Sequence, residues 1–334
     1  MQIPETALED SGKTQNISNN AAHTMTQIVG ATHPGNRDHN EDAFIADSGL
    51  GLGLVADGMG GYACGEVASE LVRDTVAEAI SNNEGLREAI ARAHAVVREV
   101  AHTDLAKKGM GSTVIAFRMR DQDYELAWVG DSRAYLWDAD ASTLHQITRD
   151  HSYVETLLSS GAISHEEAVN HPNRNLITQA VGVAGDEGLE IDMIRGRLGA
   201  HQQLLICSDG LVDEVLDDDI AGLMASAADP GEAVQRLIQQ AVANGGSDNI
   251  SVVIAYCEQG GEAALEPEIV RSTRAARPSV LNQASPDSLA HAGSREETFS
   301  RLPLFQKLQS RDTQLRILWA GALLVAVLIV ALVL

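Results

Sequence analysis

The chain has 334 residues and a formal net charge of −23, from 24 Lys and Arg against 47 Asp and Glu. That length accommodates one large domain or two ordinary ones, and an apolar content of 44% excludes a chain that is disordered throughout. The acidity argues against nucleic acid as a partner, because a polyanion would be repelled over most of the surface. The three cysteines are scattered, which excludes a disulfide framework and a cysteine zinc site.

The first 25 residues are polar and acidic and lack an apolar core, so they predict a disordered tail rather than a secretory signal. Residues 259–300 are rich in Ser, Ala, Pro and charge and show no sustained period, which is typical of a flexible linker. We therefore expect one folded domain over residues 26–258.

Residues 317–334 form an apolar run without a charge or a strongly polar group. As a helix this run would span roughly 27 Å, close to the thickness of a bilayer core. The alternative is a buried core helix, but such a helix would show a polar stripe. The sequence predicts a C-terminal transmembrane helix.

A basic segment, residues 301–316, precedes this run. It carries Arg301, Lys307, Arg311 and Arg316 against a single acidic residue, Asp312. Basic residues beside a membrane helix mark its cytoplasmic side. We expect a single-pass C-terminal anchor in the cell inner membrane, with the folded domain in the cytoplasm.

Five short apolar runs within 26–258 have the length and boundaries of strands, and each has a carboxylate at one end. The runs are 43–46 after Glu41-Asp42, 50–56 before Asp57-Gly58, 124–129 before Gly130-Asp131, 203–208 before Asp209-Gly210, and 250–256 after Asp248-Asn249. Helical periodicity appears at 64–81, 85–103 and 230–243. Short turns between 112–118, 124–129 and 133–137 favour hairpins, hence an α+β fold with antiparallel sheets.

Each Asp-Gly pair taken alone is ordinary turn chemistry. As a set, however, carboxylates at strand ends can converge on one edge of a sheet, where they could not all stay ionised without a cation. Oxygen ligands without a Cys or His cluster select hard cations such as Mg²⁺ or Mn²⁺. Two such ions can activate a water molecule and neutralise a phosphoryl oxygen.

Arg37 indicates the kind of substrate. It lies four positions before Glu41 and is therefore close to the predicted cation site. A guanidinium beside a di-cation site is a bidentate ligand for phosphate oxygens. The alternative is a surface arginine paired with Asp38.

The same residues carry a family resemblance. The chain resembles the metal-dependent Ser/Thr protein phosphatases of the PPM, or 2C-type, family, and its bacterial branch in particular. The ordered match consists of GNRDHNEDAF (35–44), VADGMGG (55–61), GMGST (109–113), WVGDSRAY (128–135), TRDHSYV (148–154), NLITQAVG (175–182), ICSDGLVD (206–213) and GSDNISVV (246–253). The resemblance implies two antiparallel sheets packed face to face with helices outside.

The resemblance also implies roles for single residues. Asp57 resembles the carboxylate that bridges two metal ions, and Gly58 the residue whose backbone carbonyl completes the shell of the second. Asp209 and Asp248 resemble the remaining ligands of the first metal.

Glu41 matches a carboxylate that holds the second metal through water, and Asp42 a neighbour in the same shell. Asp131, with Asp209, resembles the pair that holds a third, weaker metal in bacterial members. Arg37 matches the phosphate-binding arginine. The implied cofactors are two Mn²⁺ or Mg²⁺ ions, and the implied reaction is direct attack of a metal-bridging hydroxide on phosphoserine or phosphothreonine.

One departure concerns the acid that protonates the leaving group. Some eukaryotic members have a histidine directly after the Asp-Gly pair, whereas this chain has Met59. Metal-bound water is the first choice for that acid, and His39 is the second. His151 resembles a family position that we interpret as structural. Residues 152–187 correspond to a variable flap near the active site, where we expect substrate selectivity to reside.

Two other classes of function remain open. A catalytically silent phosphoprotein-binding scaffold would be expected to lack one or more of the carboxylates. A calcium-binding protein would collect its ligands from one short segment, whereas these are spread from Glu41 to Asp248. The expected partners are phosphorylated Ser/Thr proteins, and the anchor points to a membrane Ser/Thr kinase or its substrate.

Overall fold

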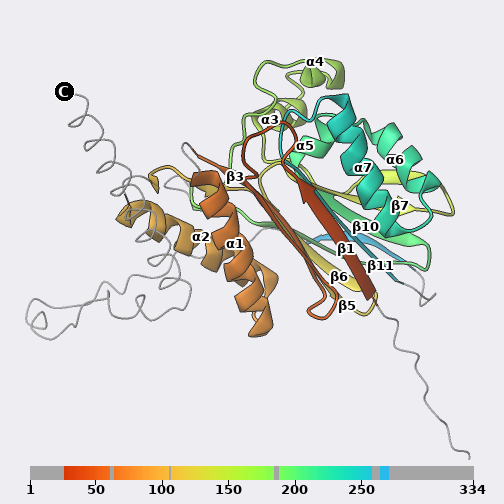
Figure 1. The fold of residues 1–334 in the computed structure, drawn as a ribbon, viewed down its shortest axis with the longest axis horizontal. Helices are drawn as coiled ribbons and strands as arrows, with labels where there is room; N and C mark the ends of the chain where they lie inside the picture. The colour runs from red at the N-terminus through yellow and green to blue at the C-terminus, as the bar shows by residue number, and fades with distance from the viewer. Residues whose placement is uncertain (1–25, 61–63, 105–106, 184–187, 258–263, 271–334) are drawn as a thin grey trace, which may run out of the picture. The chain divides into compact units, whose positions relative to one another are not determined.

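The computed structural model describes residues 26–60, 64–104, 107–183, 188–257 and 264–270. These residues form two antiparallel β-sheets, which Figure 1 shows edge-on with helices on either side. The first sheet has the strand order β1 (Thr26–His33), β11 (Ile250–Cys257), β10 (Gln202–Cys207), β7 (Arg133–Asp138) and β8 (Thr143–Gln146). The second has the order β12 (Leu265–Val270), β9 (Asp192–Arg197), β6 (Asp123–Val129), β5 (Val114–Arg120), β3 (Leu52–Met59) and β2 (Asp42–Asp47), with β4 (Gly111–Ser112) paired to β3.

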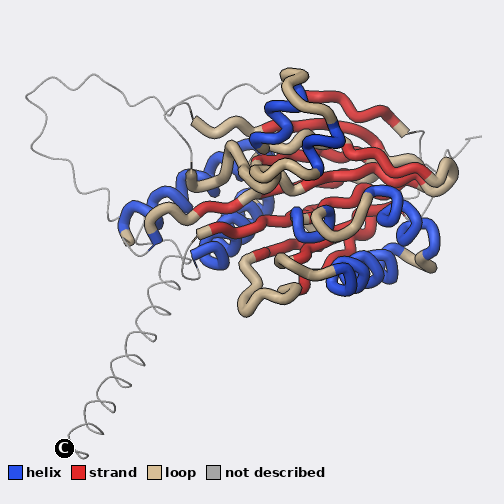
Figure 2. Tube along the Cα trace, turned by 90° about the horizontal axis from the view of Figure 1, so that it is seen from above, coloured by secondary structure: helices blue, strands red, loops and turns tan. Residues whose placement is uncertain are grey.

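Helices pack on the outer face of each sheet, so the predicted α+β sandwich is confirmed for the described residues (Figure 2). The second sheet is covered by α1 (Cys64–Ser81) and α2 (Leu86–Thr103). The first is covered by α5 (Asp209–Val212), α6 (Asp217–Ser226) and α7 (Pro230–Asn244). Two short helices, α3 (Tyr153–Ser159) and α4 (His165–Val169), lie in the segment between β8 and β9.

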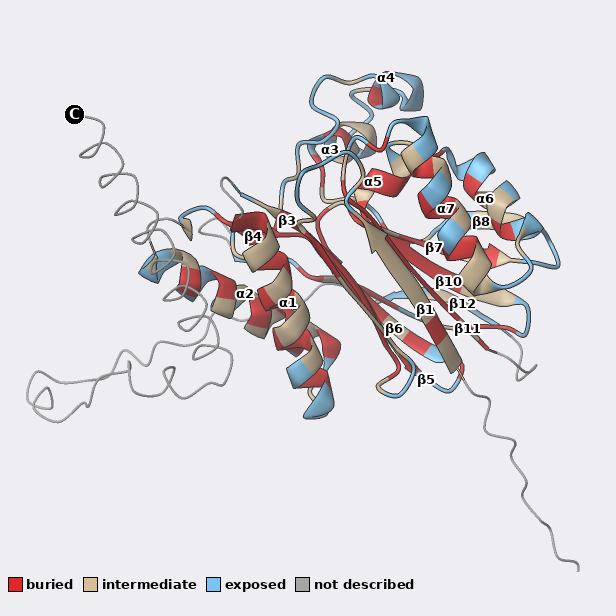
Figure 3. Ribbon diagram, in the orientation of Figure 1, coloured by how far each residue is buried: buried red, intermediate tan, exposed pale blue. Residues whose placement is uncertain are grey.

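Two hydrophobic clusters hold the two sheets together and hold α5, α6 and α7 on the first sheet. Figure 3 shows that α1, α2 and α7 also carry buried residues. Phe117 and Trp128 of the second sheet pack with Val253 of the first between the two sheets. Trp137 packs with Leu237 of α7 on the outer face of the first sheet. Full burial of one such side chain contributes about 1.5–3 kcal/mol.

Helix α7 begins at Pro230, as the sequence predicted. The Asp229 carboxylate accepts a hydrogen bond from the backbone N–H of Glu232 at 2.8 Å, and Pro230 occupies the first helical turn. Leu237 and Ala241, four residues apart, are completely buried on one face. The predicted helices at 64–81 and 85–103 are confirmed as α1 and α2.

Two predicted strands differ from the observed ones near the functional end of the sheet. The strand predicted to stop at residue 56 continues as β3 through Met59, because Gly58 and Met59 pair with β4. The strand predicted at 112–118 is interrupted at Thr113, whose backbone N–H donates to the carbonyl of Asp57 at 2.8 Å. Asp57 therefore lies inside a strand and not in the turn after it.

The predicted linker at 259–300 is wrong over part of its length, since β12 (Leu265–Val270) pairs with β9 at the sheet edge. Leu265 and Ile269 are 55% and 74% exposed, so backbone pairing rather than a buried apolar face holds this strand. No helix in the described part of the chain is long and apolar enough to cross a membrane. The predicted transmembrane helix at 317–334, the basic segment 301–316 and the N-terminal tail 1–25 lie outside the described residues.

Candidate active site

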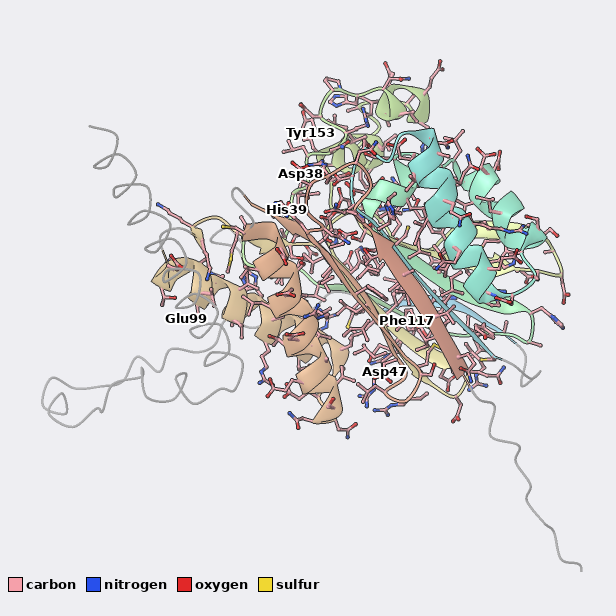
Figure 4. All side chains as sticks on the ribbon, in the orientation of Figure 1. Asp38, His39, Asp47, Glu99, Phe117 and Tyr153 are labelled. Atoms are coloured by element: carbon pink, nitrogen blue, oxygen red, sulfur yellow. The ribbon has the colours of Figure 1, made fainter. Side chains whose placement is uncertain are left out.

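The predicted carboxylates lie where strands from both sheets end. Asp42 and Asp57 face each other in the register of β2 and β3. Asp131 lies in the turn between β6 and β7, Asp209 is the first residue of α5 with one residue between it and β10, and Asp248 has one residue between it and β11. Figure 4 labels Asp38 and His39 of the adjoining loop at this end of the sheets. The convergence predicted from the sequence is therefore present in the fold.

The buried carboxylates affect one another electrostatically. Burial raises the pKa of Asp57 well above its ordinary value, and four neighbouring carboxylates raise it further, namely Asp42, Asp209, Asp131 and Asp248. Burial likewise raises the pKa of Asp209 well above its ordinary value, with Asp131 and Asp213 as the next causes. A cation among these groups would favour their ionised forms and reverse this shift.

Asp42 is held by two serines. Its Oδ2 accepts hydrogen bonds from the Ser251 hydroxyl at 2.7 Å and from the Ser208 hydroxyl at 2.9 Å. The pKa of Asp42 is raised to about 6, first by burial and also by the Asp248 charge, although these two hydrogen bonds lower it. Burial is also the largest cause that raises the pKa of Asp131 to about 6, followed by the Asp150 carboxylate.

Glu41 and Gly58 meet at the start of α1. The Gly58 backbone N–H donates to the Glu41 carbonyl at 3.1 Å. The Glu41 carboxylate accepts a backbone hydrogen bond from Gly65 in the first turn of α1, which opposes the rise in its pKa caused by burial. A Cβ atom on Gly58 would lie 2.1 Å from the Gly65 carbonyl oxygen. Only glycine fits between these backbones.

Arg37 is tied to one of the predicted metal ligands. Its Nη2 donates to Oδ2 of Asp248 at 2.8 Å, and its Nε donates to the Ser247 carbonyl at 2.9 Å. More than half of the Arg37 side chain, 55%, is exposed to solvent. The pairing predicted as the alternative, with Asp38, is not found among the described ion pairs. The guanidinium thus borders the carboxylates and stays accessible to an anion.

The donor set fits hard divalent cations. Each predicted ligand offers oxygen, and Oδ1 of Asp209 and of Asp42 is buried without a hydrogen-bond partner in the described part of the chain. An unpartnered buried carboxylate oxygen is costly, and a cation would satisfy it. No three Asp, Glu, His or Cys side chains of the described residues are already arranged to hold a metal ion.

The supporting residues were not identified from the sequence. Thr113 accepts the backbone N–H of Asp57 on its hydroxyl at 3.1 Å, and Ser208 and Ser251 hold Asp42. Asn249 binds the loop that carries Arg37. The only available signal was their position within two or three residues of a strand-end carboxylate or its pairing partner.

The two histidines considered in the sequence occupy different surroundings. His39 is exposed in the loop after β1. The His151 ring is stacked on Trp128, and its Nδ1 accepts a hydrogen bond from the Gly130 backbone N–H at 3.2 Å. The His151 Nε2 lies 3.4 Å from the Asp192 carboxylate. These contacts agree with the structural interpretation of His151.

The segment between β8 and β9 is joined to the site at its base. The carbonyl and N–H of Val181 pair with Ser112, next to Gly58. On the other side, the Nδ1 of His94 on α2 accepts a hydrogen bond from the Gly182 backbone N–H at 3.0 Å. Burial is the largest cause that lowers the pKa of His94 from 6.5 to about 4, and the Arg98 charge is the next.

His94 predicts a pH dependence of stability. Because its folded-state pKa is depressed, the unfolded chain binds a proton first as the pH falls, so stability present above pH 6.5 is lost toward pH 4. We expect a loss of about 1 kcal/mol between pH 7 and pH 5, after allowance for solvent screening. Urea unfolding of the wild type and His94→Gln at both pH values measures it. An identical pH dependence in the two proteins would contradict this assignment.

Comparisons with known proteins agree with this geometry. The family model described as Protein phosphatase 2C matches residues 29–244. The serine/threonine phosphatase stp of Listeria welshimeri is 35% identical over 231 residues, which are 65% of this chain and 90% of that protein. The serine/threonine protein phosphatase PstP of Mycobacterium tuberculosis is 38% identical over 226 residues, which cover 66% of this chain and 42% of PstP.

Solved structures give the same result. The crystal structure of Mycobacterium tuberculosis PstP superposes with a TM-score of 0.64 at 33% identity, covering 70% of this chain and 99% of that one. The PstP catalytic domain in complex with two manganese ions superposes with a TM-score of 0.61 at 33% identity, covering 70% of this chain and 98% of that one. The chain therefore belongs to the protein phosphatase 2C family, the metal-dependent protein serine/threonine phosphatases also called PPM, and to its bacterial branch.

Proposed function

We propose that this chain hydrolyses phosphoserine and phosphothreonine side chains of proteins at the cytoplasmic face of a membrane, in opposition to a Ser/Thr protein kinase. The observation that carries the chemistry is the meeting of buried carboxylates from both sheets beside the exposed guanidinium of Arg37. The proposal of a membrane location rests on the apolar run at 317–334 and the basic segment 301–316.

The residues divide into ligands and a substrate-binding group. Asp57, Asp209 and Asp248 would hold one divalent ion, with Asp57 and the Gly58 carbonyl facing a second. Glu41 and Asp42 would border that second ion, and Asp131 with Asp209 could hold a third, weaker one. When bound, Mn²⁺ or Mg²⁺ supplies a water of lowered pKa and neutralises charge on the phosphate.

This chain's own residues prepare the phosphate for reaction. Asp248 and Ser247 each accept one hydrogen bond from the Arg37 guanidinium. Its other N–H groups can therefore bind and orient phosphate oxygens. Ser208 and Ser251 fix the Asp42 carboxylate. Preorganised groups of this kind stabilise developing charge without reorganising during the reaction.

Arg37→Ala is expected to raise KM for a phosphothreonine peptide about 30-fold, because a charge-assisted contact of about 2 kcal/mol to phosphate is lost. Arg37→Lys should recover part of this loss, since an ammonium keeps the charge without the bidentate geometry. Steady-state kinetics with saturating Mn²⁺ measure both. Arg236→Ala, which removes a surface ion pair with Glu232 on α7, is the matched control. Equal KM values for Arg37→Ala and wild type would contradict the role given to Arg37.

The proposed anchor has a separate test. Cells expressing the full chain should retain the protein in the membrane pellet after an alkaline carbonate wash. A chain that ends at residue 300 should appear in the supernatant. If both chains stay in the supernatant, the membrane location is wrong while the phosphatase chemistry is unaffected.

A further inference from the structure

The side chain of Asn249 binds the loop of residues 34–41 at several points. Its Oδ1 accepts the backbone N–H of Glu41 at 2.7 Å. Its Nδ2 donates to the carbonyl of Pro34 at 3.0 Å and to the carbonyl of His39 at 3.0 Å. Both donor hydrogens of the amide and one acceptor position are thus used on this one loop. The Asn249 residue is only 4% exposed, so water cannot readily replace these bonds.

The backbone of Asn249 contacts the segments that carry the predicted metal ligands Asp248 and Asp209. Its N–H donates to Oδ1 of Asp248 at 2.8 Å, and its carbonyl accepts the Ser208 hydroxyl at 3.3 Å. A Cβ atom on Gly210 would lie 2.1 Å from the same carbonyl oxygen, so the turn that carries Asp209 packs directly on it. Asn249 therefore connects the loop with both strand ends that carry Asp209 and Asp248.

The Arg37 backbone N–H donates to the Pro34 carbonyl at 3.1 Å, and the Asn36 backbone N–H donates to the Gly246 carbonyl at 2.8 Å. The contacts of Arg37 with Asp248 and Ser247 are made by a side chain that is 55% exposed. The side chain of Asn36, which is also exposed, donates to the carbonyl of Gly245. The two carbonyls held by Nδ2 of Asn249, those of Pro34 and His39, lie on either side of Arg37.

We infer that Asn249 is a positioning residue that sets the distance between the phosphate-binding arginine and the metal-binding carboxylates. This inference rests on the proposed function of Arg37. Asn249 itself touches no reacting atom; it acts through the backbone of the loop. Loosening the loop should weaken phosphate binding more than it slows the chemical step.

Two substitutions separate the contacts. Asn249→Asp keeps an acceptor for the Glu41 N–H and loses both donor hydrogens toward Pro34 and His39. Asn249→Ala loses all three bonds and is the second variant if Asn249→Asp does not fold. Gln122→Ala is the matched control, because Gln122 is also a buried amide (7% exposed) that holds a turn through the Leu198 carbonyl at 2.9 Å, at the distant β5–β6 connection.

The test uses the full chain in mild detergent with saturating Mn²⁺. We expect both Asn249 variants to raise the inhibition constant of inorganic phosphate and the KM of a phosphothreonine peptide about tenfold, with kcat reduced by less than about threefold. Gln122→Ala should change neither constant. Values for the Asn249 variants within twofold of wild type would overturn the inference.

Arg37→Ala, measured in parallel, separates the proposed role of Arg37 from the positioning role of Asn249. If Arg37→Ala raises both constants and the Asn249 variants do not, the inference about Asn249 alone is wrong. If Arg37→Ala leaves both constants unchanged, the proposed function of Arg37 fails, and the inference that depends on it fails as well.

Discussion

Asp57→Asn is expected to reduce metal-dependent phosphatase activity by at least about 10³-fold while the domain stays folded. Asp57 lies among four other carboxylates, and its removal takes away a ligand that both proposed metal sites share. Metal ions supply several kcal/mol of charge stabilisation to reactions of this kind, and each 1.36 kcal/mol is a factor of ten in rate. Phosphate release measures the loss of activity, and Mn²⁺ titration calorimetry measures the loss of metal binding.

The same substitution is expected to reduce activity without reducing the stability of the metal-free protein. Because burial and like charges raise the pKa of Asp57, ionising it without metal is unfavourable. The neutral amide of Asp57→Asn should therefore leave the metal-free protein as stable as wild type or more so. An activity loss that merely followed unfolding would contradict the assignment.

Asp47→Asn provides the matched control for Asp57→Asn. Asp47 lies at the other end of β2, where it pairs with Leu52, and its Oδ1 accepts the Leu50 backbone N–H at 2.9 Å. Figure 4 shows Asp47 far from His39 along the sheets. An asparagine there keeps the acceptor oxygen, so both activity and Mn²⁺ binding should remain at wild-type values.

Gly58→Ala is expected to lower the free energy of unfolding by about 2–3 kcal/mol and kcat/KM by about 10²-fold. A Cβ atom at this position would lie 2.1 Å from the Gly65 carbonyl oxygen and 2.6 Å from the Glu41 carbonyl oxygen. Neither backbone group can move without shifting α1 or the loop that carries Glu41. A displacement of about 1 Å in a catalytic site costs on the order of 10²-fold in rate.

Urea unfolding and steady-state kinetics measure the two effects of Gly58→Ala. Gly222→Ala is the control, because a Cβ atom on Gly222 in α6 has no described neighbour within 4 Å. Replacing glycine by alanine in a helix should raise stability by about 0.5–1 kcal/mol and leave activity unchanged. Wild-type stability and kinetics in Gly58→Ala would contradict the close approach of β3 and α1.

Local sequence patterns predicted much of this fold. The run 250–256 is almost entirely apolar and directly follows Asp248-Asn249, and it forms a strand because both of its faces are buried. The carboxylates at strand ends could be predicted from the same pattern, because each is a charged residue next to an apolar run. The helix at 230–243 was marked by Pro230 at its start.

Contacts between distant segments could not be predicted in this way. The bond from Asn249 to Pro34 joins residues 215 positions apart, and no local period reports it. The break at Thr113 follows from its bonds to Asp57, which depend on the pairing of β3 with its neighbours. The strand Leu265–Val270 has exposed side chains and is held by backbone bonds to β9, so its sequence resembles a linker.

The most direct test of the account is phosphate release from a phosphothreonine peptide by the full-length chain. It is measured with Mn²⁺, with Mg²⁺ and with chelator, beside the variant Asp209→Asn. We expect release that requires a divalent ion, stops with chelator and is lost in Asp209→Asn. Release that persists in chelator or in Asp209→Asn would contradict a catalytic centre built on these carboxylates. No release with either ion, from a folded preparation, would instead favour a silent phosphoprotein-binding scaffold.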